Sequence, residues 1–281
     1  MTNLELQKIA NEVRRDIITS TYCAKCGHPG GSLSAADMFT YLYFEELNVD
    51  PKNPKWDDRD RFVLSKGHTA PGLYGALAQK GFFPREEMKT LRKFGSILQG
   101  HPCMNATPGV DMSTGSLGQG ISTAVGMALA GQVDKKDYRV YTLLGDGEVQ
   151  EGQVWEAAMF AGARKLDNLV VIVDNNGLQI DGAVEDVCNI HPLDKKFEAF
   201  NFHVITIDGH DFDAIRSAMR EAKETKGCPT AIIMKTVKGK GVSFMEGDAG
   251  WHGKATNDEE YKVAMADLDK IAEQLEKAGE Q

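Results

Sequence analysis

The sequence lacks a long hydrophobic run, since no apolar segment approaches the roughly 20 residues that span a bilayer, and we predict no membrane contact. Its first residues, MTNLELQKIANEVRRD, have the pattern of an amphipathic helix and lack the apolar core of a signal peptide. Cysteine is scarce: five residues with scattered spacing indicate a reducing, cytoplasmic location rather than a disulfide framework. Basic residues are outnumbered, and the net charge of −9 argues against a nucleic-acid partner.

Two of the cysteines, Cys23 and Cys26, form a CxxC pair. A zinc ribbon needs a second pair at similar spacing, and the remaining cysteines supply none. The pair is then either two thiols packed on a helix or a redox pair, and the spacing leaves both interpretations open.

The centre of the predicted fold is the stretch from Tyr141 to Gly182. An apolar run breaks at the Gly-Asp-Gly of residues 145–147, a helical segment follows, and a second apolar run, Leu169 to Val173, breaks at Asp-Asn-Asn. This alternation predicts a βαβ unit of a parallel sheet, with both polar clusters at the carboxyl edge where such sheets bind ligands. There, Asp146 and Asn176 offer the hard oxygen ligands that Mg²⁺ and Ca²⁺ prefer.

This stretch has no Lys or Arg between Gly145 and Ala163, although it carries several acids besides Asp146. A P-loop would place a Lys after its glycines, and the GxGxxG fingerprint of dinucleotide-binding proteins is absent as well. A phosphorylated ligand is therefore expected here only with a divalent cation between it and the acids. Taken alone, each polar cluster could equally be a surface turn. That alternative is weaker for two clusters within one βαβ unit.

Outside this stretch, strands and helices continue to alternate, which predicts an α/β protein with one domain (1–281) and a three-layer α/β/α arrangement around a mainly parallel sheet. Ser34, followed by Asp37, has the pattern of a helix N-cap. The Gly-, Pro-, Ser- and Thr-rich loop from 95 to 120 is long enough to indicate a function. Other predicted elements are helices at 3–26, 70–80, 84–93, 121–132, 193–200, 211–225 and, charged and exposed, 257–278, with strands at 61–64, 203–207 and 230–237.

Four histidines lie next to a Gly in predicted loops, where backbone and ligand can approach closely: His28, His68, His101 and His252. One such histidine would more simply be part of a surface turn, but four in one α/β domain favour a shared pocket. Imidazoles with a pKa near neutrality suit proton transfer to and from hydroxyl and carbonyl oxygens. A zinc site made of histidines alone is the competing interpretation, which the lack of an i, i+4 pair on a helix weakens.

The Gly-Asp-Gly of residues 145–147, followed at residue 175 by Asn-Asn, resembles the thiamine diphosphate signature of transketolases and their relatives. Further blocks also resemble transketolase, in transketolase order. The resemblance covers about residues 10 to 255 and implies a thiamine diphosphate-binding (PP-type) domain. The blocks are Gly27-His28-Pro29-Gly30, Ser65-Lys66-Gly67-His68, Gly100-His101-Pro102, TGSLGQG at 114–120 and Trp251-His252-Gly253.

The resemblance also implies site residues. The side chains of Asp146 and Asn176 and the carbonyl of Leu178 would hold Mg²⁺ or Ca²⁺ on the cofactor diphosphate. Glu151 resembles a family glutamate at a subunit contact, and is equally a first-turn acid favoured by the helix dipole. The implied catalytic residues, which would bind sugar hydroxyls and pass protons, are His28, His101 and His252. The implied cofactor-binding residues are His68, Gly115, Leu117, Gly145, Asp146, Gly147, Glu151 and Asn176.

Transketolase chemistry also needs a pyrimidine-binding domain, which supplies the activating glutamate and the arginines for sugar phosphate, and the resemblance ends before it. We therefore expect the N-terminal subunit of a split transketolase of the pentose phosphate pathway. A C-terminal partner subunit would complete it, as a heterotetramer of two plus two, and the sugar-phosphate donor and acceptor stay undefined. The alternatives are the α-type subunit of a 2-oxo acid dehydrogenase, a deoxyxylulose-phosphate synthase-like enzyme, and a non-catalytic scaffold.

Overall fold

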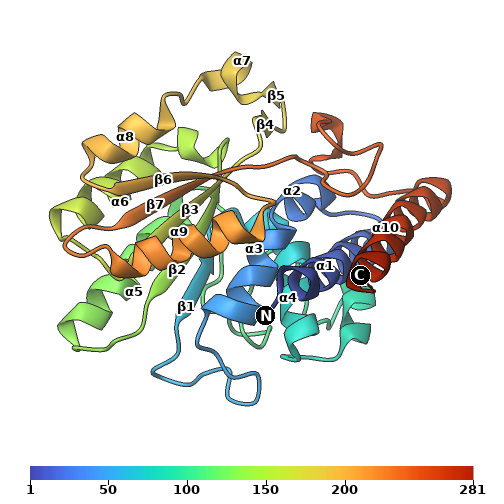
Figure 1. Ribbon diagram of the computed structural model, residues 1–281, viewed down its shortest axis with the longest axis horizontal. Coiled ribbons are helices and arrows are strands. Elements are labelled where there is room, and N and C mark those ends of the chain that lie inside the picture. Colours follow the sequence, from blue (N-terminus) through green and yellow to red (C-terminus); the bar gives the residue numbers. More distant parts are fainter. Residues whose placement is uncertain (281) are drawn as a thin grey trace.

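A parallel sheet forms the centre of the fold in the computed structural model, which describes residues 1–280 (Figure 1). Within that range the sheet has five strands in the order β1-β2-β3-β7-β6, and each neighbouring pair is parallel. The α/β prediction is therefore confirmed. The strands are β1 (Arg61–Leu64), β2 (Val140–Gly145), β3 (Leu169–Asn175), β6 (His203–Asp208) and β7 (Thr230–Lys235).

Helices cover both faces of this sheet, because its central strands are apolar on both sides (Figure 1). Successive residues of β2 point to opposite faces, so Leu143 packs in one buried cluster and Leu144 in the other. The first cluster takes in α1, α3, α4 and α9, and the second α5 and α6. These two cores give the predicted three layers.

The helices and turns follow the predicted order, with small shifts at their ends. The predicted helix at 84–93 is a 3₁₀ turn, Arg85–Thr90, and a π-helical turn occupies Leu42–Glu46. Three further 3₁₀ turns are Gly67–Thr69, Glu148–Gln150 and Ala249–Trp251. The α-helices are α1 (Asn3–Ala24), α2 (Pro29–Ser34), α3 (Ala36–Tyr41), α4 (Ala70–Lys80), α5 (Gln119–Val133), α6 (Gly152–Ala163), α7 (Val184–Cys188), α8 (Leu193–Ala199), α9 (Phe212–Glu224) and α10 (Asp258–Gly279).

The prediction of a helix N-cap at Ser34 was wrong. Ser34 is the last residue of α2, and its hydroxyl donates to Asp174 at 2.5 Å. Asp37 does not cap either, because Arg14 binds its buried carboxylate at 2.6 Å and His210 at 2.7 Å. Asp37, which the local pattern placed in a helix N-cap, is therefore a partner in a long-range ion pair.

Two further features differ from the expectation. A small antiparallel hairpin, β4 (Leu178–Gln179) with β5 (Gly182–Ala183), and the short α7 follow β3 where no element was predicted. The C-terminal helix is not wholly exposed, because α10 buries Ala264 and Leu268 against the body and accepts a bond from the Asn11 side chain at its Leu268 carbonyl. Within residues 1–280, no helix combines the length and hydrophobicity needed to cross a membrane.

Candidate functional site

The candidate site lies where β2 and β3 end side by side. Gly145 pairs with Asp174 in register, so the loops that follow the two strands meet. Asp146 then accepts from the backbone N–H of Gly147 at 2.8 Å and from that of Gly177 at 2.5 Å. The first bond is local, whereas the second ties the loop after β2 to the loop after β3. The predicted βαβ unit thus brings its two polar clusters together.

A cavity of about 100 Å³ opens at this edge and contains most of the predicted site residues. A larger hollow of about 390 Å³, lined by Arg59 and residues 104–111 among others, contains none of them. We take the smaller cavity as the candidate site because the titratable groups converge there. Its predicted lining residues are His68, Leu117, Gly145, Asp146, Gly147, Asn176, Leu178 and His252.

Four predicted residues lie outside this lining. His28 and His101 lie beside it, with ring centroids 6.4 Å apart, and the His28 centroid is 5.2 Å from that of His68. Gly115 lies against His101, because a Cβ on this glycine would be 3.3 Å from the imidazole. Glu151 is exposed at the start of α6. The structure therefore gathers the histidine loops but leaves Glu151 on the surface.

Asp146 is a buried carboxylate whose hydrogen bonds come from backbone N–H groups. Burial, and then the nearby charge of Asp174, raise its pKa to about 6. A divalent cation would relieve both effects by neutralising the carboxylate. The Asn176 side-chain oxygen, which accepts from the Leu178 N–H at 3.1 Å, lines the same cavity. The side chains of Asp146 and Asn176 thus offer oxygen atoms as metal ligands, which suits Mg²⁺ or Ca²⁺.

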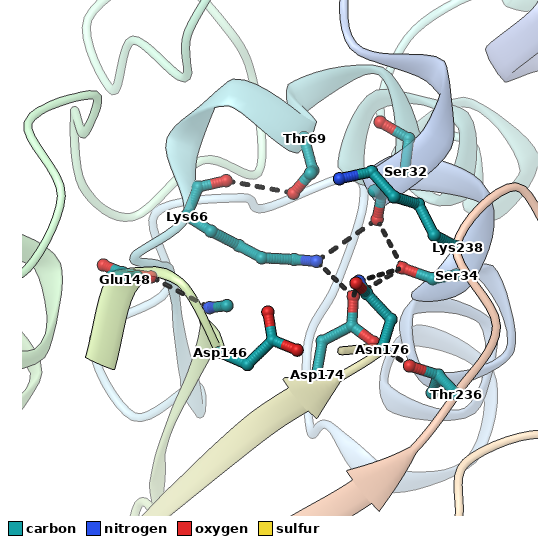
Figure 2. Close-up of polar contacts among 12 residues, drawn as sticks. Ser32, Ser34, Lys66, Thr69, Asp146, Glu148, Asp174, Asn176, Thr236 and Lys238 are labelled. Carbon is teal, nitrogen blue, oxygen red and sulfur yellow. Dashed lines mark hydrogen bonds and ion pairs between the residues drawn. The ribbon is translucent and has the colours of Figure 1, made fainter. Parts of the chain in front are cut away.

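An ion pair that the sequence did not reveal anchors the wall of this cavity. The Lys66 ammonium binds the carboxylate of Asp174, which also accepts from the hydroxyls of Ser34 and Thr236 (Figure 2). Burial alone would raise the pKa of Asp174, but Lys66 and these hydrogen bonds outweigh burial and lower it. Asp174 therefore stays ionised and joins the end of β3 to the segments after β1 and β7 and to α2.

A second lysine reaches the cavity from the loop after β7. The Lys238 ammonium donates to the Leu178 carbonyl at 3.2 Å and lies 3.0 Å from Nδ1 of His252. Burial, and then the charge of Lys66, lower its pKa to about 8. Lys66 and Lys238 therefore supply positive charge beside the acids of the cavity. The expectation that only a metal ion could do so was incomplete, because it considered residues 145–163 and both lysines lie outside that range.

The four loop histidines form one cluster, as predicted. The His252 ring stacks on that of His68 at 5.0 Å and lies 5.5 Å from that of His28. The expected pKa near neutrality was wrong: burial, and then neighbouring cations, lower it to about 4 for His28 and about 3 for His252. The imidazoles are therefore neutral at pH 7, and Nδ1 of His28 is buried and has no hydrogen-bond partner within residues 1–280.

Three further observations concern the zinc and redox alternatives and the remaining histidine that follows a Gly. Among residues 1–280, no group of three or more His, Cys, Asp or Glu side chains is arranged to hold a metal. Cys23 and Cys26 are half-buried free thiols at the end of α1. His210, the other histidine that follows a Gly, pairs with Asp37 and accepts from the Val237 N–H, which is a structural role.

The fold and the cavity define a ligand-binding α/β domain with its site at the carboxyl edge of a parallel sheet. Residues 6–270 match the family described as transketolase, thiamine diphosphate binding domain. The chain therefore belongs to the transketolase family, and it corresponds to the N-terminal, thiamine diphosphate-binding domain of that family.

Three similar proteins illustrate this membership. The chain is 49% identical over 267 residues to the 6-deoxy-6-sulfo-D-fructose transketolase subunit SqwG of Clostridium sp. strain MSTE9, covering 95% of this chain and 97% of that protein. It is 45% identical over 274 residues to an apulose-4-phosphate transketolase subunit of Phocaeicola vulgatus, covering 98% and 96%. The crystal structure of transketolase from Campylobacter jejuni superposes with a TM-score of 0.90 at 37% identity, covering 96% of this chain and 43% of that one.

Proposed function

We propose that this chain is the cofactor-binding subunit of a split transketolase, which transfers a two-carbon ketol unit from a ketose phosphate to an aldose phosphate. The observation that carries the proposal is the convergence of Asp146, Asn176 and four histidine loops on one edge of the sheet. A scaffold that only binds a partner has no need of this convergence. We also propose that residues 1–281 form one diphosphate-binding domain.

The residues present fit thiamine diphosphate with Mg²⁺ or Ca²⁺. The cation would be held by the Asp146 carboxylate, the Asn176 side-chain oxygen and the Leu178 carbonyl, which line one cavity. His68, Gly115, Leu117 and the glycines 145 and 147 would lie against the cofactor. Thiamine diphosphate supplies a nucleophilic carbon and an electron sink for the two-carbon unit.

His28, His101 and His252 would bind the hydroxyls of the sugar. Because the pKa of each is lowered by burial, each imidazole is neutral at pH 7, with one N–H to donate and one nitrogen to accept. A neutral imidazole can accept a proton from a hydroxyl, and the imidazolium that forms must then give that proton up again, because burial disfavours its charge.

A partner subunit would complete the site, and two adjacent helices support its presence. From Gln119 to Val133, α5 has no charged residue, and α6 has only Glu156. Hydrophobic side chains are nevertheless exposed there, namely Val133, Met159 and Phe160. Exposed apolar surface of this kind is typical of a protein–protein contact. We propose that a pyrimidine-binding, C-terminal transketolase subunit packs on this face, in a heterotetramer of two plus two, with Glu151 at the contact.

Similar subunits differ in the sugar for which they are named. A cytoplasmic enzyme of the pentose phosphate pathway would use common ketose and aldose phosphates. The similar subunits from Clostridium and Phocaeicola vulgatus are named for 6-deoxy-6-sulfo-D-fructose and for apulose 4-phosphate. Both sugars therefore belong in the substrate panel.

The test is native co-purification of the chain from its own cell extract. The eluate is assayed with thiamine diphosphate and Mg²⁺ for two-carbon transfer from xylulose 5-phosphate to ribose 5-phosphate, and then with the two other sugars as donors. A second polypeptide together with transfer from any donor supports the proposal. A lone chain that is active without a partner would refute the split, and a pair inactive with every donor would favour the scaffold.

Substitution at the proposed metal site separates an enzyme from a scaffold. With Asp146→Ala, we expect the partner to co-purify unchanged while transfer activity is lost. The matched control is Asp137→Ala, an exposed acid before β2 at the opposite edge of the sheet. Equal activity of the two variants would count against the metal role of Asp146.

A further inference from the structure

Glu148 lies in the wall of the candidate cavity, and its carboxylate binds three separate loops at once. One carboxylate oxygen accepts from the Ser65 hydroxyl at 2.6 Å and from the Gly118 N–H at 2.9 Å. The other oxygen accepts from the Gly145 N–H at 3.0 Å. Glu148 is only 2% exposed, so water does not compete for these bonds.

The three loops carry different parts of the site. Ser65 begins the Ser-Lys-Gly-His block that ends in His68, Gly118 follows Leu117, and Gly145 precedes Asp146. His68, Leu117 and Asp146 all line the cavity, whereas each comes from a different part of the chain. One buried carboxylate is thus the common acceptor for the Ser65 hydroxyl and the Gly118 and Gly145 N–H groups, one donor from each loop.

Close packing gives these loops little freedom to adjust separately. A Cβ on Gly67 would lie 2.7 Å from the Thr114 hydroxyl oxygen, and one on Gly120 would lie 2.6 Å from the Ser65 Cα. The Thr114 hydroxyl in turn donates to the Leu64 carbonyl at 2.6 Å. A shift at Glu148 would therefore pass to all three loops together.

We propose that Glu148 is a positioning residue, which sets the relative placement of the three loops that bind thiamine diphosphate and its metal ion. The inference rests on the proposed function, because it concerns the affinity of that cofactor. The carboxylate of Glu148 is used by these three hydrogen bonds, so Glu148 acts on the cofactor through the placement of the loops. Its part is to hold His68, Leu117 and Asp146 in one arrangement before the cofactor arrives.

The hydrogen-bond pattern explains why Glu148→Gln is the informative change. The Ser65 hydroxyl accepts from the Ile121 N–H at 3.1 Å, which leaves its proton to donate to Glu148. All three groups facing Glu148 are therefore donors, and only a carboxylate can accept from all of them. Glutamine has the same shape but turns an NH₂ group toward at least one donor, so one loop loses its anchor.

The experiment measures binding of thiamine diphosphate, in saturating Mg²⁺, to the complex of this chain with its partner subunit by isothermal titration calorimetry. For Glu148→Gln we expect the dissociation constant to rise about 10- to 100-fold, the range for residues that orient ligand groups from behind. At saturating cofactor, kcat should stay close to that of the wild type, because the reacting groups are unchanged.

Glu46→Gln is the matched control. Glu46 is a buried glutamate whose carboxylate accepts from the Tyr141 hydroxyl at 2.6 Å, at the opposite end of β2. The Glu46→Gln substitution should lower the thermal midpoint by about as much as Glu148→Gln does, and it should leave the affinity for the cofactor unchanged. Weakened binding in both variants would mean that Glu148 acts through general stability, which overturns the inference.

Two further outcomes separate this inference from the proposed function. If the wild type binds thiamine diphosphate and Glu148→Gln binds it equally well, the positioning role is refuted and the proposed function stands. If the wild-type complex binds no thiamine diphosphate, the proposed function fails, and the inference fails with it. Glu148→Asp, which keeps the carboxylate on a shorter stem, should recover part of the affinity that glutamine loses.

Discussion

Breaking the ion pair between Lys66 and Asp174 tests what holds the site edge together. Lys66 is 2% exposed and Asp174 is fully buried, so removing one partner leaves the other charge where water cannot reach it. Lys66→Met keeps the aliphatic stem and removes the ammonium. Such changes lose about 3–5 kcal/mol of unfolding free energy. We expect the lower end, about 3 kcal/mol, because Ser34 and Thr236 still donate to Asp174.

The assay is urea denaturation of the cofactor-free chain followed by circular dichroism, with an unchanged slope as the condition for comparing midpoints. The double variant Lys66→Met/Asp174→Asn removes both charges and should recover part of the loss, which gives the interaction energy of the pair. Lys136→Met is the control, because Lys136 pairs with Asp58 on the surface and should matter little. A loss below about 1 kcal/mol for Lys66→Met, as expected of an exposed pair, would refute the reasoning.

Three further predictions concern the same edge of the sheet. Burial, and then a neighbouring lysine, lower the pKa of His252 to about 3, below the 6.5 of the unfolded chain. Because the unfolded chain takes up this proton first, the contribution of His252 to the free energy of unfolding is fully present above pH 6.5 and is lost as the pH falls toward 3. In urea titrations, His252→Gln should therefore lose less unfolding free energy than the wild type between pH 7 and pH 4.5. Burial raises the pKa of Asp146 to about 6, so its ionised form costs stability at pH 7. Asp146→Asn removes this cost but turns its NH₂ toward the N–H of Gly147 or Gly177, so it should change the stability of the cofactor-free chain little while abolishing calorimetric binding of Mg²⁺ with thiamine diphosphate. Gly120→Ala would force its Cβ to 2.6 Å from the Ser65 Cα and should cost about 1–3 kcal/mol, whereas Gly126→Ala meets no atom within 4 Å and should gain roughly 0.5–1 kcal/mol in the same titration. Equal effects of the two alanines, a wild-type pH profile for His252→Gln, or metal binding by Asp146→Asn would contradict the respective arguments.

Patterns within one segment were enough to predict the sheet and its helices. The apolar runs of β2 and β3 are continuous because both faces are buried, and the breaks after them predicted where the polar groups lie. Period and turn signals are local properties, so they survive folding wherever no distant partner competes. The hairpin β4–β5 has only two residues in each strand, which is too short for either signal.

The missed residues are those whose roles depend on distant partners. Lys66 belongs to a recognisable motif, but its ion pair with Asp174 joins segments far apart in the chain. Lys238 enters the cavity from a loop that is remote in sequence from the acids it faces. In the sequence, Glu148 is simply one more acid after the Gly-Asp-Gly. A buried acid beside predicted ligands could have been found by asking which backbone donors the converging loops leave unpaired.

The strand order also has a consequence for the order of folding. The pairing of Val140 with Leu169 in β2–β3 closes a short loop of chain. The pairings of Arg61 with Val140 and of Val170 with Thr230 close much longer loops. Because closing a longer loop costs more entropy before any contact repays it, we expect the β2–α6–β3 unit to form early and β1 to dock late. Asp146 and Asn176 would then take their positions before the loop of His68 arrives. Half of the site would be assembled while the histidine cluster is still forming.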